Sequence, residues 1–319
     1  MEVGKYGSME VWGCGSVDVG SKFSPTPLLS YSYTPILPHS HNFHTPILYK
    51  EMLSPEIRDT IVRSSKIYDL GQPIYMGMPV YPTHPPYIFT MVRRHGDVFR
   101  ENGFSGANEL LVMCGHTGTH LDGLGHISQN CKLYGGVDAI ETQTGGKGLK
   151  SHGMETVAPI LCPGVLLDVP AYQNIEVLPP TYEISSAELE AVAKFEGVSI
   201  NPGDAVFIRT GWIRHWNTPQ TYIGQDTGLP GPNNDAAEWL ASKKIRVTGS
   251  DTITYECVKP NTNRMPVHMT LLVKNGIHII EMINLEELSR DRIYSFLTII
   301  SPLKIVGATG SPIRPLAIV

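Results

Sequence analysis

Three histidines and an aspartate lie within eleven residues near the middle of the chain, in the segment His-Thr-Gly-Thr-His-Leu-Asp-Gly-Leu-Gly-His. They are His116, His120, Asp122 and His126. Neutral imidazole nitrogen and carboxylate oxygen are the ligands that Zn²⁺ and Mn²⁺ accept in proteins. Because burying four such groups merely as packing would cost free energy, the segment predicts a site for a divalent metal ion.

The four side chains are expected to have different roles. His116, His120 and Asp122 would leave positions on the ion open for water and substrate, which is typical of a catalytic site. A bound ion of this kind lowers the pKa of its water toward about 7 and polarises a carbonyl oxygen. His126 follows two glycines, and its ordinary pKa of about 6.5 suits proton transfer. We therefore predict that His126 is a general base rather than a ligand.

A strand end followed by a glycine-rich turn is the local structure that this spacing favours. All four positions are even-numbered, so their side chains would leave the same face of an extended backbone. A helix, at about 100° per residue, would turn Asp122 away from His116 and His120, and Gly118 with its β-branched neighbours disfavours one. The apolar run at residues 110–113 is expected to lead into this strand.

The pattern His-x-Gly-Thr-His-x-Asp-x-x-x-His resembles the signature of the cyclase-like metal-dependent hydrolases, which include bacterial kynurenine formamidases and isatin hydrolases. The likeness extends over about residues 67–315. The other segments that carry it are Met78-Pro79-Val80-Tyr81-Pro82, Arg93-Arg94-His95-Gly96-Asp97, Pro202-Gly203-Asp204, Arg209-Thr210-Gly211-Trp212, Gly249-Ser250-Asp251-Thr252, Pro266-Val267-His268 and Gly276-Ile277-His278-Ile279-Ile280-Glu281. The resemblance implies the swivelling β/β/α fold and hydrolysis of carbon–nitrogen bonds other than peptide bonds.

The resemblance also implies roles for individual residues. The first three positions of the central motif match the family's metal ligands, and His126 matches its general base. A later histidine and glutamate of the family correspond to His268 and Glu281, although Glu281 could instead be a solvated strand end. If two ions bind, Asp122 is the natural bridge, because a carboxylate can offer one oxygen to each ion.

Two features near these residues leave questions open. Kynurenine formamidases of this type carry Ala-Pro after the motif aspartate, where this chain has Gly123-Leu124-Gly125. The resemblance therefore does not define the substrate. Asp251, in a family-like Gly-x-Asp-Thr stretch, either orients a ligand histidine through a hydrogen bond or caps a turn.

Composition limits the classes of protein to which the chain can belong. With 319 residues, 41% of them apolar, it can form a full hydrophobic core. A net charge of −5, with no basic cluster larger than a pair, argues against nucleic-acid or membrane partners and favours a small-molecule carbonyl substrate.

The five cysteines lack paired spacing and predict reduced, mostly buried thiols. Neither a membrane-spanning run nor a signal-peptide pattern is found, which favours a cytoplasmic protein.

The first 50 residues differ in composition from the rest of the chain. They are rich in Gly, Ser, Pro and Tyr and carry few charges, which is typical of a poorly structured arm. His39, His41 and His44 lie here and are not expected to bind metal, because a flexible segment bears the full ordering cost of ligation. Residues 51–319 are expected to form one domain that begins with a helix over residues 51–65.

Short apolar runs alternating with helical periods predict an α/β domain with a mixed sheet. Strands are expected at residues 66–70, 164–169, 204–209 and 245–249, and helices at residues 185–196 and 235–244, capped by Ser185 or Ser186 and by Asp235.

Two long irregular segments are expected between these elements. Residues 71–86 hold five prolines. The apolar and aromatic side chains in and after this segment either line a pocket or cover a core edge. They are Tyr75, Met76, Met78, Tyr81, Tyr87 and Phe89. Residues 129–153, punctuated by glycines, could close over the site as a lid.

Three functions fit these residues. The leading hypothesis is a hydrolase that opens an amide or cyclic amide, with a lactone or ester as an alternative, using metal-activated water and His126 as general base. The second is a cyclase or dehydratase that uses the ion as a Lewis acid on a polyketide-like carbonyl. The third is a metal-binding protein without catalysis. The family resemblance, together with the extent of apolar sequence, also predicts a homodimer or higher homo-oligomer.

Overall fold

The computed structural model describes residues 66–143, 145–260, 262 and 264–319. The predicted arm, the helix over residues 51–65 and the histidines of the arm lie outside the described residues. The strands are β1 (Ile67–Asp69), β2 (Ile88–Arg93), β3 (Asn108–Val112), β4 (His120–Asp122), β5 (Ile160–Asp168), β6 (Glu183–Ile184), β7 (Ala205–Arg209), β8 (Gly231–Pro232), β9 (Val247–Ser250), β10 (His278–Glu281), β11 (Ser295–Ile300), β12 (Gly310–Pro312) and β13 (Leu316–Ile318). The helices are α2 (Val169–Gln173), α3 (Ser186–Glu196), α4 (Pro219–Ile223), α5 (Asn234–Ser242), α6 (Pro266–His268), which continues as a π-helical turn over Met269–Lys274, and α7 (Glu286–Asp291).

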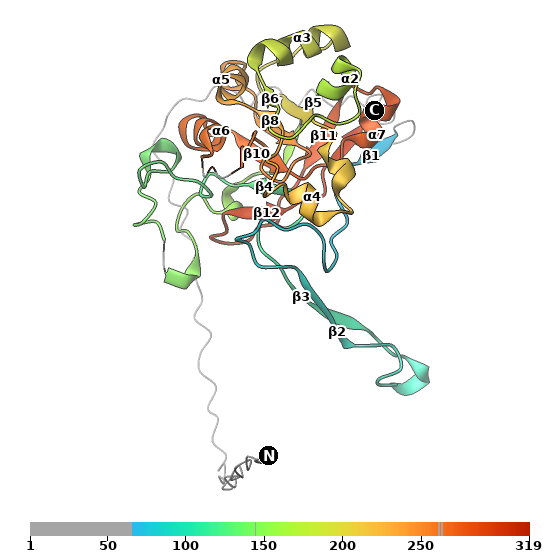
Figure 1. Cartoon of the computed structure of the whole chain (residues 1–319). Coiled ribbons are helices and arrows are strands. Elements are labelled where there is room, and N and C mark those ends of the chain that lie inside the picture. Colours follow the sequence, from blue (N-terminus) through green and yellow to red (C-terminus); the bar gives the residue numbers. More distant parts are fainter. Residues whose placement is uncertain (1–65, 144, 261, 263) are drawn as a thin grey trace, which may run out of the picture. The chain divides into compact units, whose positions relative to one another are not determined.

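A nine-stranded sheet organises this part of the chain, in the order β1-β13-β11-β5-β7-β9-β10-β4-β12 (Figure 1). Strands β5, β7, β9 and β10 run parallel to one another, with helices in the connections between them. The strands on both sides of this group pair antiparallel. The prediction of an α/β domain with a mixed sheet is therefore confirmed.

The central strands are buried on both faces, as their nearly continuous apolar sequences predict. Val206 and Ile208 of β7 pack in one core cluster with apolar residues of α3 and α5. Ala205 and Phe207, which leave the opposite face, pack in a second cluster that contains Leu121 of β4. The strand that carries the metal motif is thus held in the sheet by its own core residue.

Most of the predicted elements are present with small shifts at their ends. The helix over residues 185–196 is α3, and its cap is Ser185, whose hydroxyl accepts a hydrogen bond from Glu188 N at 3.3 Å. The cap predicted for α5 was wrong by two residues. Asn233 caps this helix by accepting from Ala236 N at 3.0 Å, whereas Asp235 lies in the first turn and accepts from Ser186 N.

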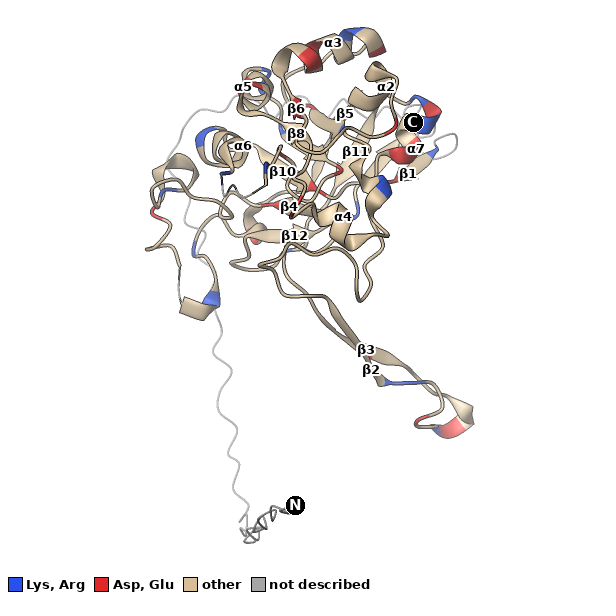
Figure 2. Cartoon of the chain, in the orientation of Figure 1, with Lys and Arg blue, Asp and Glu red and all other residues tan. Residues whose placement is uncertain are grey.

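Strands β2 and β3 form a separate two-stranded hairpin. Every residue of both strands is exposed, and the hairpin extends away from the nine-stranded sheet (Figure 1). Residues 110–113, expected to lead directly into the motif strand, lie at the end of this hairpin instead. Figure 2 shows few charged residues along the two strands. The apolar run precedes the motif as predicted, but as a strand of this hairpin and not of the nine-stranded sheet.

The segment at residues 71–86 is irregular, as predicted. Met78 packs with Trp212 and Ile213 in a third core cluster, whereas Met76 is 60% exposed. The core-edge alternative therefore holds for Met78.

The four described cysteines are all free. Only Cys162 is buried among them, and Cys131 is exposed, so the prediction of mostly buried thiols was wrong. None of the helices in the described ranges is long and apolar enough to cross a membrane. The cytoplasmic location stays a prediction.

Candidate metal centre

Strand β4 carries the centre of the candidate site. His120 and Asp122 leave the same face of this strand, and Leu121 between them leaves the other. His116 does not continue the strand. Residues 115–119 form a turn in which Gly118 has a φ of +60°, because the chain here passes from the hairpin into the sheet. The predicted alternation is right within β4 and wrong for His116, whose side chain reaches the site from the turn.

Strand β12 holds the ring of His116 beside Asp122. Nδ1 of His116 is 2.8 Å from Asp122 Oδ1, and Nε2 is 3.0 Å from the hydroxyl of Thr309. Gly310 lies opposite Asp122 in the β12–β4 register. A Cβ atom at Gly310 would lie 2.5 Å from the His116 ring, so only glycine leaves room for the imidazole here.

The register between β4 and β10 adds Glu281 to the site. Glu281 lies directly opposite His120 in this antiparallel pair, where the two side chains share a face. Nε2 of His120 is 3.4 Å from Glu281 Oε2 and 3.4 Å from Asp122 Oδ1. Glu281 is only 7% exposed. The alternative that it is a solvated strand end is therefore wrong.

His268, the last residue of α6, approaches the same two carboxylates. Its Nε2 lies 3.2 Å from Glu281 Oε1 and 3.6 Å from Asp122 Oδ2. Glu256 orients this ring from behind, with Oε1 2.6 Å from His268 Nδ1. The Glu256 carboxylate also accepts the backbone N–H groups of Val267 and His268, at 3.1 and 2.9 Å. The histidine is thus held through both its backbone and its ring.

Glu256 is a site residue that the sequence prediction missed. The suggested orienting residue was Asp251, but Asp251 Oδ1 instead accepts from the backbone N and the hydroxyl of Thr210, at 2.8 and 2.6 Å. Of the two alternatives for Asp251, orientation of a ligand histidine was therefore wrong. No regular sequence spacing predicts a contact between Glu256 and His268. The chain between them is irregular, and only the tertiary structure brings the two side chains together.

Hydrogen bonding fixes which nitrogen of each ring faces the carboxylates. Nδ1 of His120 donates to the carbonyl of Gly118 at 2.7 Å, and Nδ1 of His268 donates to Glu256. A neutral imidazole has one N–H, so in the neutral form of each ring Nε2 would face the carboxylate oxygens with a lone pair. Oδ2 of Asp122 has no hydrogen-bond partner within the described ranges. Acceptors that converge in this way need a positive charge between them.

The pKa values of His120 and His268 show that the neighbouring carboxylates favour positive charge on these rings. Burial alone lowers the pKa of His120, but its interactions with Asp122 and Glu281 outweigh burial and raise the pKa to about 10. In His268 the carboxylates likewise outweigh burial and raise the pKa. Without a metal ion a proton satisfies these acceptors, and a divalent cation would compete for the same place.

Two overlapping groups of three side chains have the arrangement of metal ligands. His116, His120 and Asp122 form one, and Asp122, His268 and Glu281 form the other, with the ligand atoms of each group within 4.8 Å of one another. Asp122 belongs to both groups and could therefore join them. Nitrogen and carboxylate oxygen donors of this kind suit Zn²⁺ or Mn²⁺.

His126 lies beside these groups but belongs to neither. Its ring centroid is 4.0 Å from that of His116 and 6.4 Å from that of His268. Burial lowers the pKa of His126 to about 4, against the opposing effect of Asp122. The ring is therefore neutral at pH 7 and can accept a proton, but it is a weaker base than the ordinary pKa of about 6.5 predicts.

A cavity of about 190 Å³ opens onto the imidazoles of the site. Tyr81 and His84 line it from the irregular segment, so the pocket alternative holds for Tyr81. The ring of His84 is 5.4 Å from that of His116, and its buried Nδ1 has no hydrogen-bond partner in the part of the chain that the structure describes. The sequence prediction missed His84, because a lone histidine among prolines carries no spacing signal.

Strained backbone accompanies two of the carboxylates. Tyr255 precedes Glu256 with a φ of +55°, and Met282 follows Glu281 with a φ of +56°. Both conformations are unfavourable for residues other than glycine and persist where the surroundings hold them. The Met282 carbonyl accepts a hydrogen bond from the Thr119 hydroxyl at 2.7 Å. This hydrogen bond connects the strained residue to the turn between His116 and His120.

Comparison with known proteins places the chain in a family. Residues 68–257 match the family model described as a putative cyclase, and the chain belongs to that family. It is 29% identical over 215 residues to isatin hydrolase of Roseibium aggregatum, covering 66% of this chain and 73% of that one. It is 26% identical over 253 residues to kynurenine formamidase of Bacillus mycoides, covering 79% and 97%.

The fold agrees with this assignment. A crystal structure described as that of a novel cyclase superposes with a TM-score of 0.73 and 28% identity, covering 83% of this chain and 93% of the other. The predicted cyclase-like fold and the family resemblance are thus confirmed.

Proposed function

We propose that this protein is a metal-dependent hydrolase that opens an amide or cyclic amide, with a lactone or ester as an alternative substrate. One observation carries the proposal. The Nε2 atoms of His120 and His268 both face the buried carboxylates of Asp122 and Glu281, at 3.2–3.6 Å, so that four potential ligand atoms converge on one place. The similarity to proteins named isatin hydrolase and kynurenine formamidase supports the choice of carbon–nitrogen bond.

In this proposal His116, His120 and Asp122 hold a Zn²⁺ or Mn²⁺ ion. His268 and Glu281 either complete the same coordination shell or hold a second ion, with Asp122 as the bridge. When bound, such an ion polarises the substrate carbonyl and activates water. Glu256 positions His268, because its carboxylate is the acceptor for Nδ1 of that ring.

His126 is the proposed general base. Its buried ring is neutral, so it can take a proton from the attacking water and return it to the leaving nitrogen. The His126 ring packs against the His116 ring. This contact keeps His126 close to the proposed ligands, although His126 is not itself a ligand in this proposal. Tyr81 and His84 form the part of the cavity wall that would contact the substrate.

The test is turnover by protein reconstituted with Zn²⁺ or Mn²⁺, against a panel of N-formyl amides, lactams, imides and lactones. We expect metal-dependent turnover, with one oxygen of ¹⁸O-labelled water appearing in the carboxylate product. Turnover of a polyketide-like substrate without ¹⁸O incorporation would favour the cyclase or dehydratase. Full metal loading with no turnover anywhere in the panel would favour a metal-binding protein without catalysis.

We also infer that the β2–β3 hairpin binds a second copy of the chain. Eleven large apolar side chains between Ile88 and Met113 are 37–68% exposed. At roughly 150 Å² for a large side chain, they present on the order of 800 Å² of apolar surface, about the area per partner of a stable interface. The exposed strands of the hairpin suit an arm exchanged reciprocally between two copies in a homodimer.

A further inference from the structure

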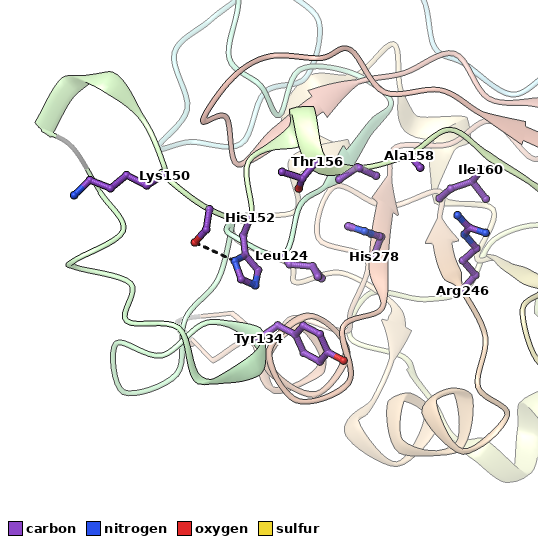
Figure 3. Close-up of a pocket in the computed structure, with 11 residues that line it drawn as sticks. Leu124, Tyr134, Lys150, His152, Thr156, Ala158, Ile160, Arg246 and His278 are labelled. Atoms are coloured by element: carbon purple, nitrogen blue, oxygen red, sulfur yellow. Dashed lines mark hydrogen bonds between the residues drawn. The ribbon is translucent and has the colours of Figure 1, made fainter. Parts of the chain in front are cut away.

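A second cavity, of about 590 Å³, lies next to the loop that joins Asp122 to His126. Arg246, which precedes β9, and His278, which begins β10, come from neighbouring parallel strands and line it together. Figure 3 shows His152 on the other side of the cavity, with Leu124 between it and His278. None of these residues is among the proposed metal ligands.

The described lining of this cavity is cationic and apolar. Arg246 and Lys150 contribute positive charge, and none of the described residues that line the cavity is an aspartate or glutamate. No ion pair among the described residues involves Arg246. Lys150 extends toward the periphery in Figure 3, whereas the exposed Arg246 guanidinium borders the cavity beside Ile160 and His278.

The apolar part of the lining narrows the class of ligand. Tyr134, Val157 and Ile160 supply aromatic and aliphatic surface beside the guanidinium. A planar guanidinium pairs well with a carboxylate through two parallel hydrogen bonds. A free phosphate would leave the apolar walls unfilled, whereas an aromatic carboxylate would satisfy both the charge and the surface.

The cavity is connected to the metal motif through one short turn. His126 N donates to the carbonyl of Gly123 at 3.0 Å, which closes a turn whose Leu124 lines the cavity. The turn packs closely against its neighbours. A Cβ atom at Gly125 would lie 2.1 Å from Leu149 and 3.1 Å from the carbonyl of His152.

A second contact joins the cavity to Asp122 itself. Nδ1 of His278 donates to the backbone carbonyl of Asp122 at 2.9 Å. A ligand that displaced Leu124 or His278 would therefore move the backbone on both sides of Gly123-Leu124-Gly125. This is the segment at which kynurenine formamidases carry Ala-Pro instead.

We propose that this cavity is a second binding site, for a small aromatic carboxylate, and that its occupancy shifts His126 through the turn at residues 123–126. Opening an aromatic cyclic amide releases a carboxylate of this class, so for such a substrate the cavity would mediate inhibition by product. The inhibition rests on the proposed function, whereas binding itself does not.

Isothermal titration of the metal-loaded protein with benzoate tests the binding. We expect the Kd of Arg246→Gln to exceed that of the wild type by about 10- to 100-fold, the worth of a charge-assisted pair. Lys194→Gln, which removes one positive charge from exposed α3, should leave the Kd unchanged. Benzamide, which has the same shape without the charge, should bind the wild type more weakly than benzoate.

Two variants distinguish this cavity from the metal centre. If benzoate binds here, His120→Ala should keep its binding while losing metal. Equal binding by wild type and Arg246→Gln, absence of any benzoate binding, or tighter binding of inorganic phosphate would each overturn the proposal.

The coupling has its own readout. In the wild type, benzoate should lower kcat with little change in KM, and Arg246→Gln should lose this effect. Inhibition that is purely competitive would refute the coupling. Absence of turnover on every substrate would refute the proposed function and leave the titration result intact.

Discussion

The metal centre and the β2–β3 hairpin depart from the usual distribution of residues in opposite ways. At the centre, ionisable side chains are buried, with Asp122 at 0% and His268 at 1% exposure. On the hairpin, apolar side chains are exposed, with Phe99 at 68%. Burying ionisable groups and exposing apolar surface are both unfavourable in free energy for an isolated chain. This difference is the basis of the two proposals, a cation bound at the centre and an apolar partner bound at the hairpin.

Removing one charge from the metal centre should have the largest effect. Asp122→Asn keeps the size of the side chain but removes the carboxylate shared by both groups of candidate ligands. We expect metal content after dialysis and turnover to fall to background, and we expect added metal to raise the melting temperature of the wild type but not of the variant. Asp226→Asn, at an exposed turn, is the control. Full metal retention by Asp122→Asn would contradict the proposed site.

His126→Ala separates the general base from the ligands. The variant should keep its metal while the rate falls by about 10² to 10⁴, the usual contribution of acid–base catalysis, and mainly in kcat. Metal analysis and steady-state kinetics measure the two effects, with His95→Ala on the exposed hairpin turn as control. A variant that loses its ion as completely as His120→Ala would show that His126 is a ligand, and His268 would become the first candidate for the base.

Glu256→Gln tests the support behind His268. The amide keeps the shape and one acceptor but loses the charge that orients the ring, so metal affinity should fall by about 10- to 100-fold. Competition with a chelator measures this, and Glu190→Gln on the exposed face of α3 provides the matched control. Unchanged affinity would mean that the backbone of α6 alone positions His268.

Changing the hairpin should leave the chemistry at the metal unaffected and alter assembly. Leu111→Asp should weaken the proposed homodimer of 35.1 kDa chains, because a charge would be buried against the partner. Sedimentation at micromolar concentration should show a dimer for the wild type and for the control Leu303→Asp, and a monomer for Leu111→Asp. A wild-type protein that sediments only as a monomer would refute the interface and leave the exposed arm to another partner.

Local sequence determined the parts of the site that lie within a few residues of one another. The two-residue spacing of His120 and Asp122 was sufficient because a strand places alternate side chains on one face. The cap of α3 was predictable as Ser185 or Ser186 because the partner of a helix cap lies only three residues away, and the structure shows that it is Ser185. The apolar runs likewise revealed the parallel strands, and the family resemblance supplied His268 and Glu281.

Tertiary structure alone decided which distant residues meet. The β4–β10 register places Glu281 opposite His120, and the path after Tyr255 brings Glu256 rather than Asp251 to His268. The sequence likewise did not show that the apolar strands of the hairpin would be exposed. Side-chain period reports which face of a strand a residue occupies, but pairing and burial depend on contacts between segments far apart in the chain. For that reason the sequence revealed the metal motif, and only the folded chain revealed what supports it.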